Sequence, residues 1–179
     1  MKKILLFTLF ITSLYADATV YLGASLGGYN EQLDVNNKSA TSEMLTLKVG
    51  YGEIKAYAVE FSLDYINNKT DLFAPGDGIK YGMNVSLLKA FDVDLFFIPF
   101  VKAGFGAGKI DSQAKVNKSS LAYGSFNLGF GSFIPLYKHI DLELGYDYRA
   151  LTYERADSAL TAISKSNVNM LYVGFNIRY

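Results

Sequence analysis

The strongest constraint in this sequence is an alternation of apolar residues with polar or small ones, which recurs in eight segments after residue 17. The clearest segment, residues 57–65, places Tyr57, Val59, Phe61, Leu63 and Tyr65 on one face and Ala58, Glu60, Ser62 and Asp64 on the other. Successive side chains of a strand point to opposite faces, whereas a helix needs a period of 3.6 residues. The other segments are 20–27, 45–51, 79–87, 97–107, 125–131, 140–149 and 171–179. The pattern predicts an all-β fold with eight strands.

The connections between these segments alternate in length. Long polar connections are expected near residues 29–43, 66–78, 109–119 and 154–166, and short ones near 52–55, 89–93 and 134–138. Consecutive strands joined in this way form an antiparallel up-and-down sheet with every long connection at one end. We therefore expect an eight-stranded antiparallel barrel.

The composition of the two faces indicates which one points inward. A soluble lipocalin-like barrel buries its apolar face, whereas a membrane barrel exposes it to lipid. The polar faces here are rich in Gly, Ser, Asn and Tyr, as a crowded interior would be. Tyrosines lie at the ends of the apolar bands, where lipid meets water, at Tyr51, Tyr57, Tyr65, Tyr148 and Tyr179. These features favour a transmembrane β-barrel.

Charge and residue content exclude several function classes. Seventeen Lys and Arg balance seventeen Asp and Glu, so no strong positive field exists to attract nucleic acid. The chain has no cysteine and only one histidine, His139, which removes thiolate chemistry and leaves little for a transition metal. We expect no cofactor and no metal site.

The N-terminus has the pattern of a secretory signal peptide. Lys2 and Lys3 precede an apolar run over residues 4–11, and small residues follow at Ala16 and Ala18. The run is shorter than the roughly 20 residues of a transmembrane helix. We expect a signal peptide over residues 1–16, cleaved after Ala16 or Ala18, and a barrel domain over residues 17–179.

The complete pattern resembles a known family. An export signal, eight alternating strands and a last strand ending in an aromatic residue are similar to the small Gram-negative outer-membrane barrels of the OmpA/OmpX type. The resemblance implies residence in the cell outer membrane, contact with its lipid and lipopolysaccharide, and insertion by the barrel-assembly machinery. In that family the machinery reads alternating apolar residues of the last strand, which match Val173, Phe175, Ile177 and Tyr179. Tyr179 departs mildly from the usual Phe.

The predicted inner face carries charges of both signs, which must be paired or hydrated in a narrow lumen. The expected lumen charge network is Lys48, Glu60, Asp64, Lys102, Asp141, Glu143, Asp147, Arg149 and Arg178. Lys48 and Glu60 should meet across neighbouring strands, and Arg178 should lie near Glu143 or Asp141. Either salt bridges fill the barrel or the charges line a narrow polar path.

Bulky side chains are also expected to close the interior. Phe96, Ile98, Phe100 and Phe133 would form an apolar plug, unless Pro99 causes a bulge that shifts the face. The remaining interior space is shared between rings and glycines. We expect Tyr21, Tyr123 and Tyr172 to occupy gaps beside Gly23, Gly27, Gly129 and Gly174.

The sequence therefore predicts a monomeric, non-enzymatic outer-membrane barrel with a structural or surface-interaction role through its outer connections. A surface protein or polysaccharide would be its partner. Two alternatives stay open: a narrow channel for small or apolar solutes, and a lipid A-modifying enzyme. Related enzymes use a His with a Ser near the outer rim, whereas His139 falls in a short turn at the opposite end.

Overall fold

The computed structural model describes residues 18–34, 39–53, 55–67, 77–111, 120–154 and 165–179. The expected signal peptide, residues 1–16, lies outside the described residues and stays a prediction. Within the described part of the chain, no helix is long and apolar enough to cross a membrane.

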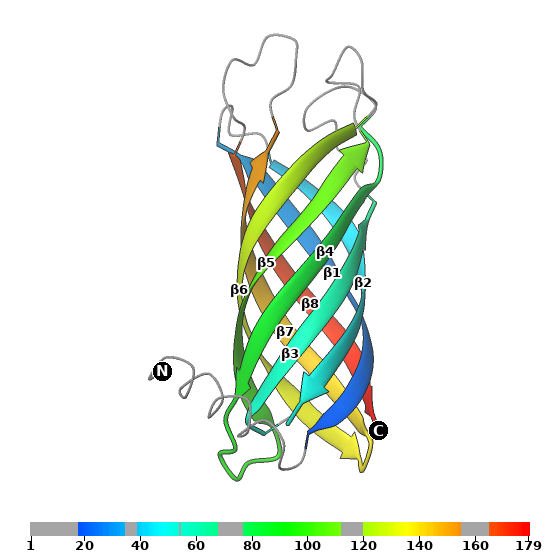
Figure 1. Cartoon of the computed structure of the whole chain (residues 1–179), viewed down its shortest axis with the longest axis vertical. Helices are drawn as coiled ribbons and strands as arrows, with labels where there is room; N and C mark the ends of the chain where they lie inside the picture. Colours follow the sequence, from blue (N-terminus) through cyan, green and yellow to red (C-terminus); the bar gives the residue numbers. More distant parts are fainter. Residues whose placement is uncertain (1–17, 35–38, 54, 68–76, 112–119, 155–164) are drawn as a thin grey trace, which may run out of the picture.

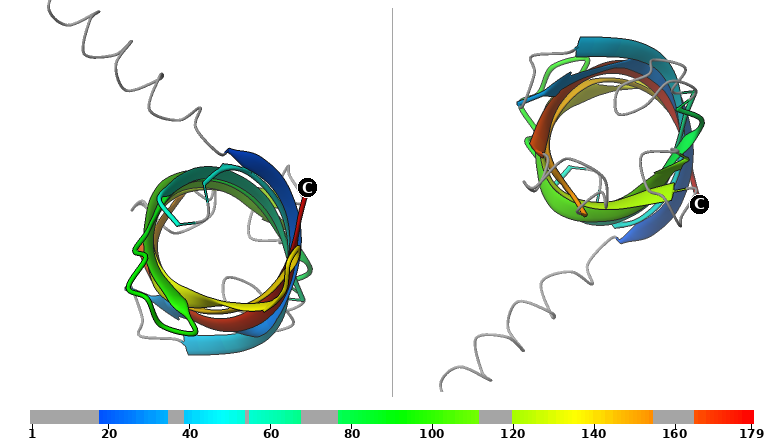
Figure 2. Two further views of the ribbon diagram at one scale, coloured as in Figure 1. Left: turned by 90° about the horizontal axis from the view of Figure 1, so that it is seen from below. Right: turned by 90° about the horizontal axis from the view of Figure 1, so that it is seen from above.

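Eight antiparallel strands close into one barrel in the order β1-β2-β3-β4-β5-β6-β7-β8 (Figure 1). Their bounds are β1 Thr19–Leu33, β2 Ser39–Gly52, β3 Tyr57–Ile66, β4 Lys80–Ala90, β5 Ile98–Asp111, β6 Ser120–Tyr137, β7 Ile140–Tyr153 and β8 Lys165–Arg178. The ring of strands is complete when viewed from either end (Figure 2). The predicted all-β, eight-stranded antiparallel barrel is confirmed.

The strands are strongly staggered around the barrel. Following paired residues from Tyr21 through each neighbouring strand in turn leads back to β1 at Glu31, ten positions further along. A stagger of this kind tilts the strands by about 35–45° from the barrel axis. The tilt of the strands is visible in Figure 1, where β8 ends at the lower end of the barrel.

Strand lengths differ from expectation at the upper end. Residues 29–43 were expected to form a long connection, but β1 and β2 continue far into this range and still pair at Gln32 and Ser39. The prediction of a long first connection is wrong, because a strand can continue in a polar sequence once its side chains leave the lipid. At the lower end the connection after Ala90 runs to residue 97, longer than predicted.

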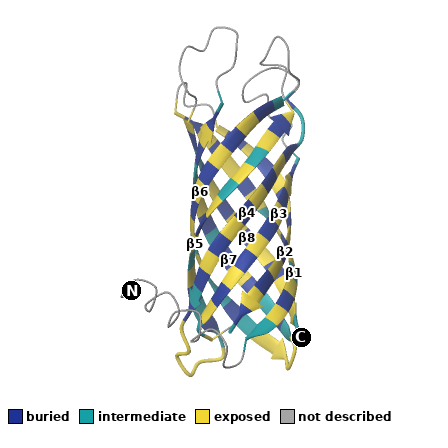
Figure 3. Ribbon diagram, viewed as in Figure 1, coloured by how far each residue is buried: buried dark blue, intermediate teal, exposed yellow. Residues whose placement is uncertain are grey.

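Burial alternates along the strands, except near the lower end of β6, and gives the barrel two different surfaces (Figure 3). Outward positions hold exposed apolar side chains such as Leu47, Leu63 and Phe175. Inward positions hold buried charged, polar and aromatic side chains such as Glu60, Asn84 and Tyr172. An apolar belt around a polar interior is the arrangement of a transmembrane barrel.

Interior aromatic rings lie against glycines of neighbouring strands. A Cβ added at Gly50 would lie 2.0 Å from the ring of Tyr21, and one at Gly145 would lie 2.3 Å from the ring of Tyr172. Tyr123 covers Gly108 in the same way. Gly27 lies beside Tyr172, as expected, whereas Gly50, Gly108 and Gly145 are partners that the sequence did not predict.

Two of the expected glycines lie against lysine side chains instead of aromatic rings. A Cβ at Gly23 would lie 2.7 Å from Cε of Lys48, and one at Gly129 would lie 2.9 Å from Cε of Lys102. The glycines therefore make room for long charged side chains as well as rings.

We expect Gly50→Ala to destabilise the barrel by about 1–3 kcal/mol, because the new methyl group would displace the Tyr21 ring. Gly28→Ala is the matched control, since a Cβ there meets nothing within 4 Å. Urea titration of the refolded variants measures the free energy of unfolding. Equal stability of the two variants would contradict the packing of Tyr21 on Gly50.

Candidate functional site: the barrel lumen

All nine residues of the predicted charge network lie on the inner face of the barrel. Seven are buried: Lys48, Glu60, Asp64, Asp141, Glu143, Asp147 and Arg149. The side chains of Lys102 and Arg178 retain 11% and 18% exposure. Burial removes these charges from water, which costs free energy. Ion pairs and hydrogen bonds within the lumen must compensate for that cost.

Glu143 is the centre of the lower charge cluster. Its carboxylate accepts a hydrogen bond from Lys48 across the lumen, and further ones from Tyr172 at 3.0 Å and Asn176 at 2.7 Å. Lys48 also lies 3.7 Å from Glu60, the partner expected from the sequence. Lys48 therefore ties β2 to β7 across the lumen as well as to its neighbour β3.

Glu60 links this cluster to two further side chains. It accepts a hydrogen bond from the Tyr21 hydroxyl at 3.0 Å and lies 3.9 Å from Lys102. Lys102 in turn lies 3.1 Å from Asp147 and donates to the Tyr172 hydroxyl at 3.0 Å. The cluster is a connected network in which each carboxylate has a cation or a hydroxyl donor.

Asp64 and Arg149 form the next level of the lumen. The Arg149 guanidinium donates to Asp64, which also accepts from Thr46 at 2.7 Å and Asn84 at 2.8 Å. Arg149 lies 3.8 Å from Asp147, so this level joins the one below. At the lower end Arg178 pairs with Asp141, one of the two partners predicted for it.

A further cluster at the upper end was missed by sequence reasoning. The Lys80 ammonium is fully buried and donates to Glu31 at 2.8 Å, to the Tyr29 hydroxyl at 2.6 Å and to the Tyr153 hydroxyl. Glu31 also accepts from Tyr153 and from Ser166 at 2.6 Å. Glu31 lies inward like Tyr29 because β1 extends to Leu33, beyond the expected end of this strand.

An apolar cluster fills the lower part of the lumen. Phe100 and Phe133 stack with ring centroids 4.5 Å apart, and Ile98 is buried beside them. Phe96 does not join, because it precedes the first residue of β5 and is 77% exposed. The four-residue plug expected from the sequence is therefore corrected to Ile98, Phe100 and Phe133.

Pro99 causes no bulge. It pairs with Ser132 in unbroken register, and the irregularity of this part of the sheet lies between Pro135 and Tyr137. The carbonyl of Pro99 accepts a hydrogen bond from the Phe91 amide, so the side of Pro99 that lacks an N–H faces the end of β4. Proline is tolerated there because β4 ends at Ala90.

The cavity at the level of the central charged side chains is very small. A cavity of about 20 Å³ lies between Lys48, Glu60, Lys102 and Arg149. This volume holds about one water molecule. The lumen is therefore packed by ion pairs and rings, with no room at this level for a substrate.

The described residues include no cluster of metal-binding side chains. No group of three or more His, Cys, Asp or Glu within residues 18–179, masked stretches aside, could hold a metal ion. His139 is exposed in the two-residue turn between β6 and β7 at the lower end, where its carbonyl accepts a hydrogen bond from the Arg178 amide. The histidine therefore lies at the end of the barrel opposite the long connections.

The residues of the predicted assembly signal lie on the outer face at the end of β8. Val173, Phe175, Ile177 and Tyr179 are all exposed, Tyr179 most of all at 73%. Strand β8 pairs with β1 along most of its length and so closes the barrel. Recognition of these side chains by the assembly machinery stays a prediction.

Neither a protein-family model nor a curated protein sequence matches the chain. Several solved structures are similar to the chain in fold. Neisserial surface protein A is 16% identical with a TM-score of 0.70 over 92% of this chain and 100% of its own. Ail, the attachment invasion locus protein of Yersinia pestis, is 14% identical with a TM-score of 0.56 over the same shares, and is also known in complex with the heparin analogue sucrose octasulfate.

The outer membrane enzyme PagL is 13% identical with a TM-score of 0.53 over 88% of this chain and 98% of its own. One fold therefore carries proteins of different function, and similarity at this level supports the architecture alone. Together with the apolar outer belt, it identifies the chain as an eight-stranded β-barrel of the bacterial outer-membrane type.

Proposed function

We propose that this outer-membrane barrel is a closed scaffold with a structural or surface-interaction role, exercised through the connections at its upper end. The observation that carries this proposal is the packed lumen, whose charged side chains pair with one another around a cavity of about 20 Å³. A cavity that holds about one water molecule between paired charges is too small for a solute to pass. A narrow channel is the alternative.

A surface protein or polysaccharide is the proposed partner, and the similarity of the fold to Ail makes a sulfated polysaccharide a suitable first probe. The enzyme alternative is weaker, because His139 lies at the lower end, away from the upper rim. The protein is proposed to act as a monomer without a cofactor.

Complementation of a deletion strain tests the proposal. One strain receives the wild type, and another receives a barrel whose stretches 68–76, 112–119 and 155–164 are replaced by short Gly-Ser connections. We expect both to restore resistance to detergent, and only the wild type to restore retention of cells on heparin-coated surfaces. Failure of the wild type to change either property would contradict the proposal, and restored uptake of small solutes would favour the channel.

We expect the double variant Phe175→Ser, Tyr179→Ser to reduce the amount of barrel in the outer membrane several-fold, because it removes two apolar side chains of the proposed assembly signal. The matched control is Phe105→Ser, Phe130→Ser, which removes two outward aromatic rings that are 70% and 59% exposed on other strands. Heat-modifiable migration of membrane fractions measures the folded barrel. Equal levels of the two variants would contradict a special role for the last strand.

A further inference from the structure

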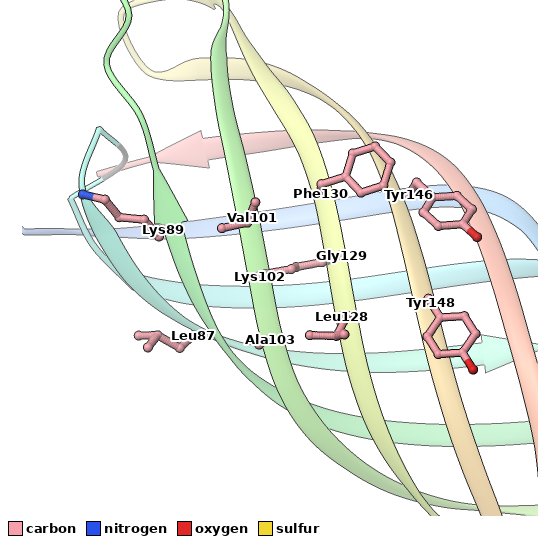
Figure 4. A pocket seen from close by; sticks show the side chains of 10 residues that line it. All are labelled: Leu87, Lys89, Val101, Lys102, Ala103, Leu128, Gly129, Phe130, Tyr146 and Tyr148. Atoms are coloured by element: carbon pink, nitrogen blue, oxygen red, sulfur yellow. The ribbon is translucent and has the colours of Figure 1, made fainter.

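A groove of about 550 Å³ crosses the outer wall of the barrel over β4–β7 (Figure 4). Its floor is Ala103, which pairs with Leu87 on one side and Leu128 on the other. Because alanine occupies a position where both neighbours are leucines, the belt is locally hollow. The groove is in the size range of small-molecule sites, about 300–1,000 Å³.

Lys89 lies at one end of this groove, and Tyr146 and Tyr148 lie at the other (Figure 4). Lys89 is the penultimate residue of β4 and pairs with Tyr57, the first residue of β3, so it marks the lower margin of the apolar belt. Its ammonium lies 4.0 Å from the centre of the Tyr57 ring. Lysines at such margins extend their charge toward lipid headgroups while the stem stays in the apolar region.

The charge of Lys89 is available to a ligand. Among the described residues Lys89 takes part in no ion pair, and its ammonium contacts only the faces of Tyr57 and Phe91. Outward strand positions of the lower half of the barrel carry no Asp or Glu within the described ranges. The outward strand positions of a second copy would therefore bring no carboxylate to Lys89, whereas a phosphate would complement it.

We propose that this groove binds an anionic phospholipid, with its phosphate on Lys89 and one acyl chain across Ala103 between Leu87 and Leu128. The groove begins at Lys89, at the headgroup level of the leaflet at the lower end, and extends over Ala103 into the apolar belt. The apolar walls supply contact area, and Lys89 supplies preference for the anionic headgroup.

The absence of tryptophan from the sequence allows a direct test. Phe130→Trp places a single reporter in the groove, and Val173→Trp places one on β8, across the barrel from β4. Each variant is refolded in vesicles that contain either brominated phosphatidylglycerol or brominated phosphatidylcholine in a non-brominated background. The two lipids carry the same brominated acyl chains and differ only in their headgroups. The ratio of their quenching efficiencies at one reporter therefore does not depend on the depth of that reporter.

We expect brominated phosphatidylglycerol to quench the groove reporter about fivefold more efficiently than brominated phosphatidylcholine does. At the β8 reporter the two lipids should quench equally. Lys89→Gln should remove the preference, and Ala103→Leu should reduce quenching by both lipids. Lys109→Gln, which removes a lysine at the upper end of β5, is the matched control and should leave the preference intact. Equal ratios at the two reporters, or a preference that survives Lys89→Gln, would overturn the proposal. Loss of quenching by both lipids together with cross-linked dimers would also overturn it, in favour of a second copy.

Discussion

Glu143→Ala is expected to destabilise the barrel by about 3–5 kcal/mol, because it leaves a buried lysine without its main partner. Glu143 accepts hydrogen bonds from Lys48, Tyr172 and Asn176, and its side chain is 1% exposed. Once it is removed, the nearest carboxylate to Lys48 is Glu60 at 3.7 Å, beyond hydrogen-bond distance. Urea titration of the refolded protein in vesicles measures the loss.

Two further variants separate the charge effect from loss of packing. The double variant Lys48→Met, Glu143→Leu removes both charges, so it should recover much of the lost stability. Lys55→Ala breaks an exposed pair with Asp92, 2.8 Å long, between two lower connections, and should have no measurable effect. A Glu143→Ala variant as stable as Lys55→Ala would show that the central network does not hold the barrel together.

Lys80→Met is expected to have a similarly large effect at the upper end, about 3 kcal/mol or more. The substitution leaves the Glu31 carboxylate buried with only the hydroxyls of Tyr153 and Ser166 as donors. It also removes the cation that lies 4.6 Å from the centre of the Tyr123 ring. The same titration measures the effect, and the upper ends of β1 and β4 should lose protection from hydrogen exchange first.

A double-mutant cycle with Glu31→Gln tests the pairing itself. If Lys80 and Glu31 stabilise each other, the double variant should be more stable than the sum of the two single losses predicts. Additive losses would mean that the two charges do not interact in the folded barrel.

The fold could be predicted from the sequence because strand alternation in a two-sided sheet is a local property. Residues 57–65 alone show which face is apolar, and the structure places every one of these side chains as the alternation requires. The ends of strands carry no such signal where both faces are polar, so β1 was ended before Glu31 and the cluster around Lys80 was missed. Phe96 was included in the plug because the inward parity of Phe100 was extended past the start of β5.

Contacts between side chains on opposite sides of the lumen could not be predicted from the sequence either. Lys48 and Glu60 lie on neighbouring strands, so their symmetric positions about a turn predicted that they meet. Glu143 lies on β7, and only closure of the barrel brings it to Lys48. The register of a closed barrel depends on its stagger, which the positions of the strands in the sequence do not define.

Conductance of the purified wild-type protein in planar bilayers tests the closed lumen most directly. Lys48, Glu60 and Glu143 at the centre, with Phe100 and Phe133 below them, leave a cavity of about 20 Å³ in the described lumen. The packing predicts no steady current and at most brief, small openings. A steady conductance of porin size in the wild type, accompanied by sugar permeation in liposomes, would contradict a closed lumen and establish a channel.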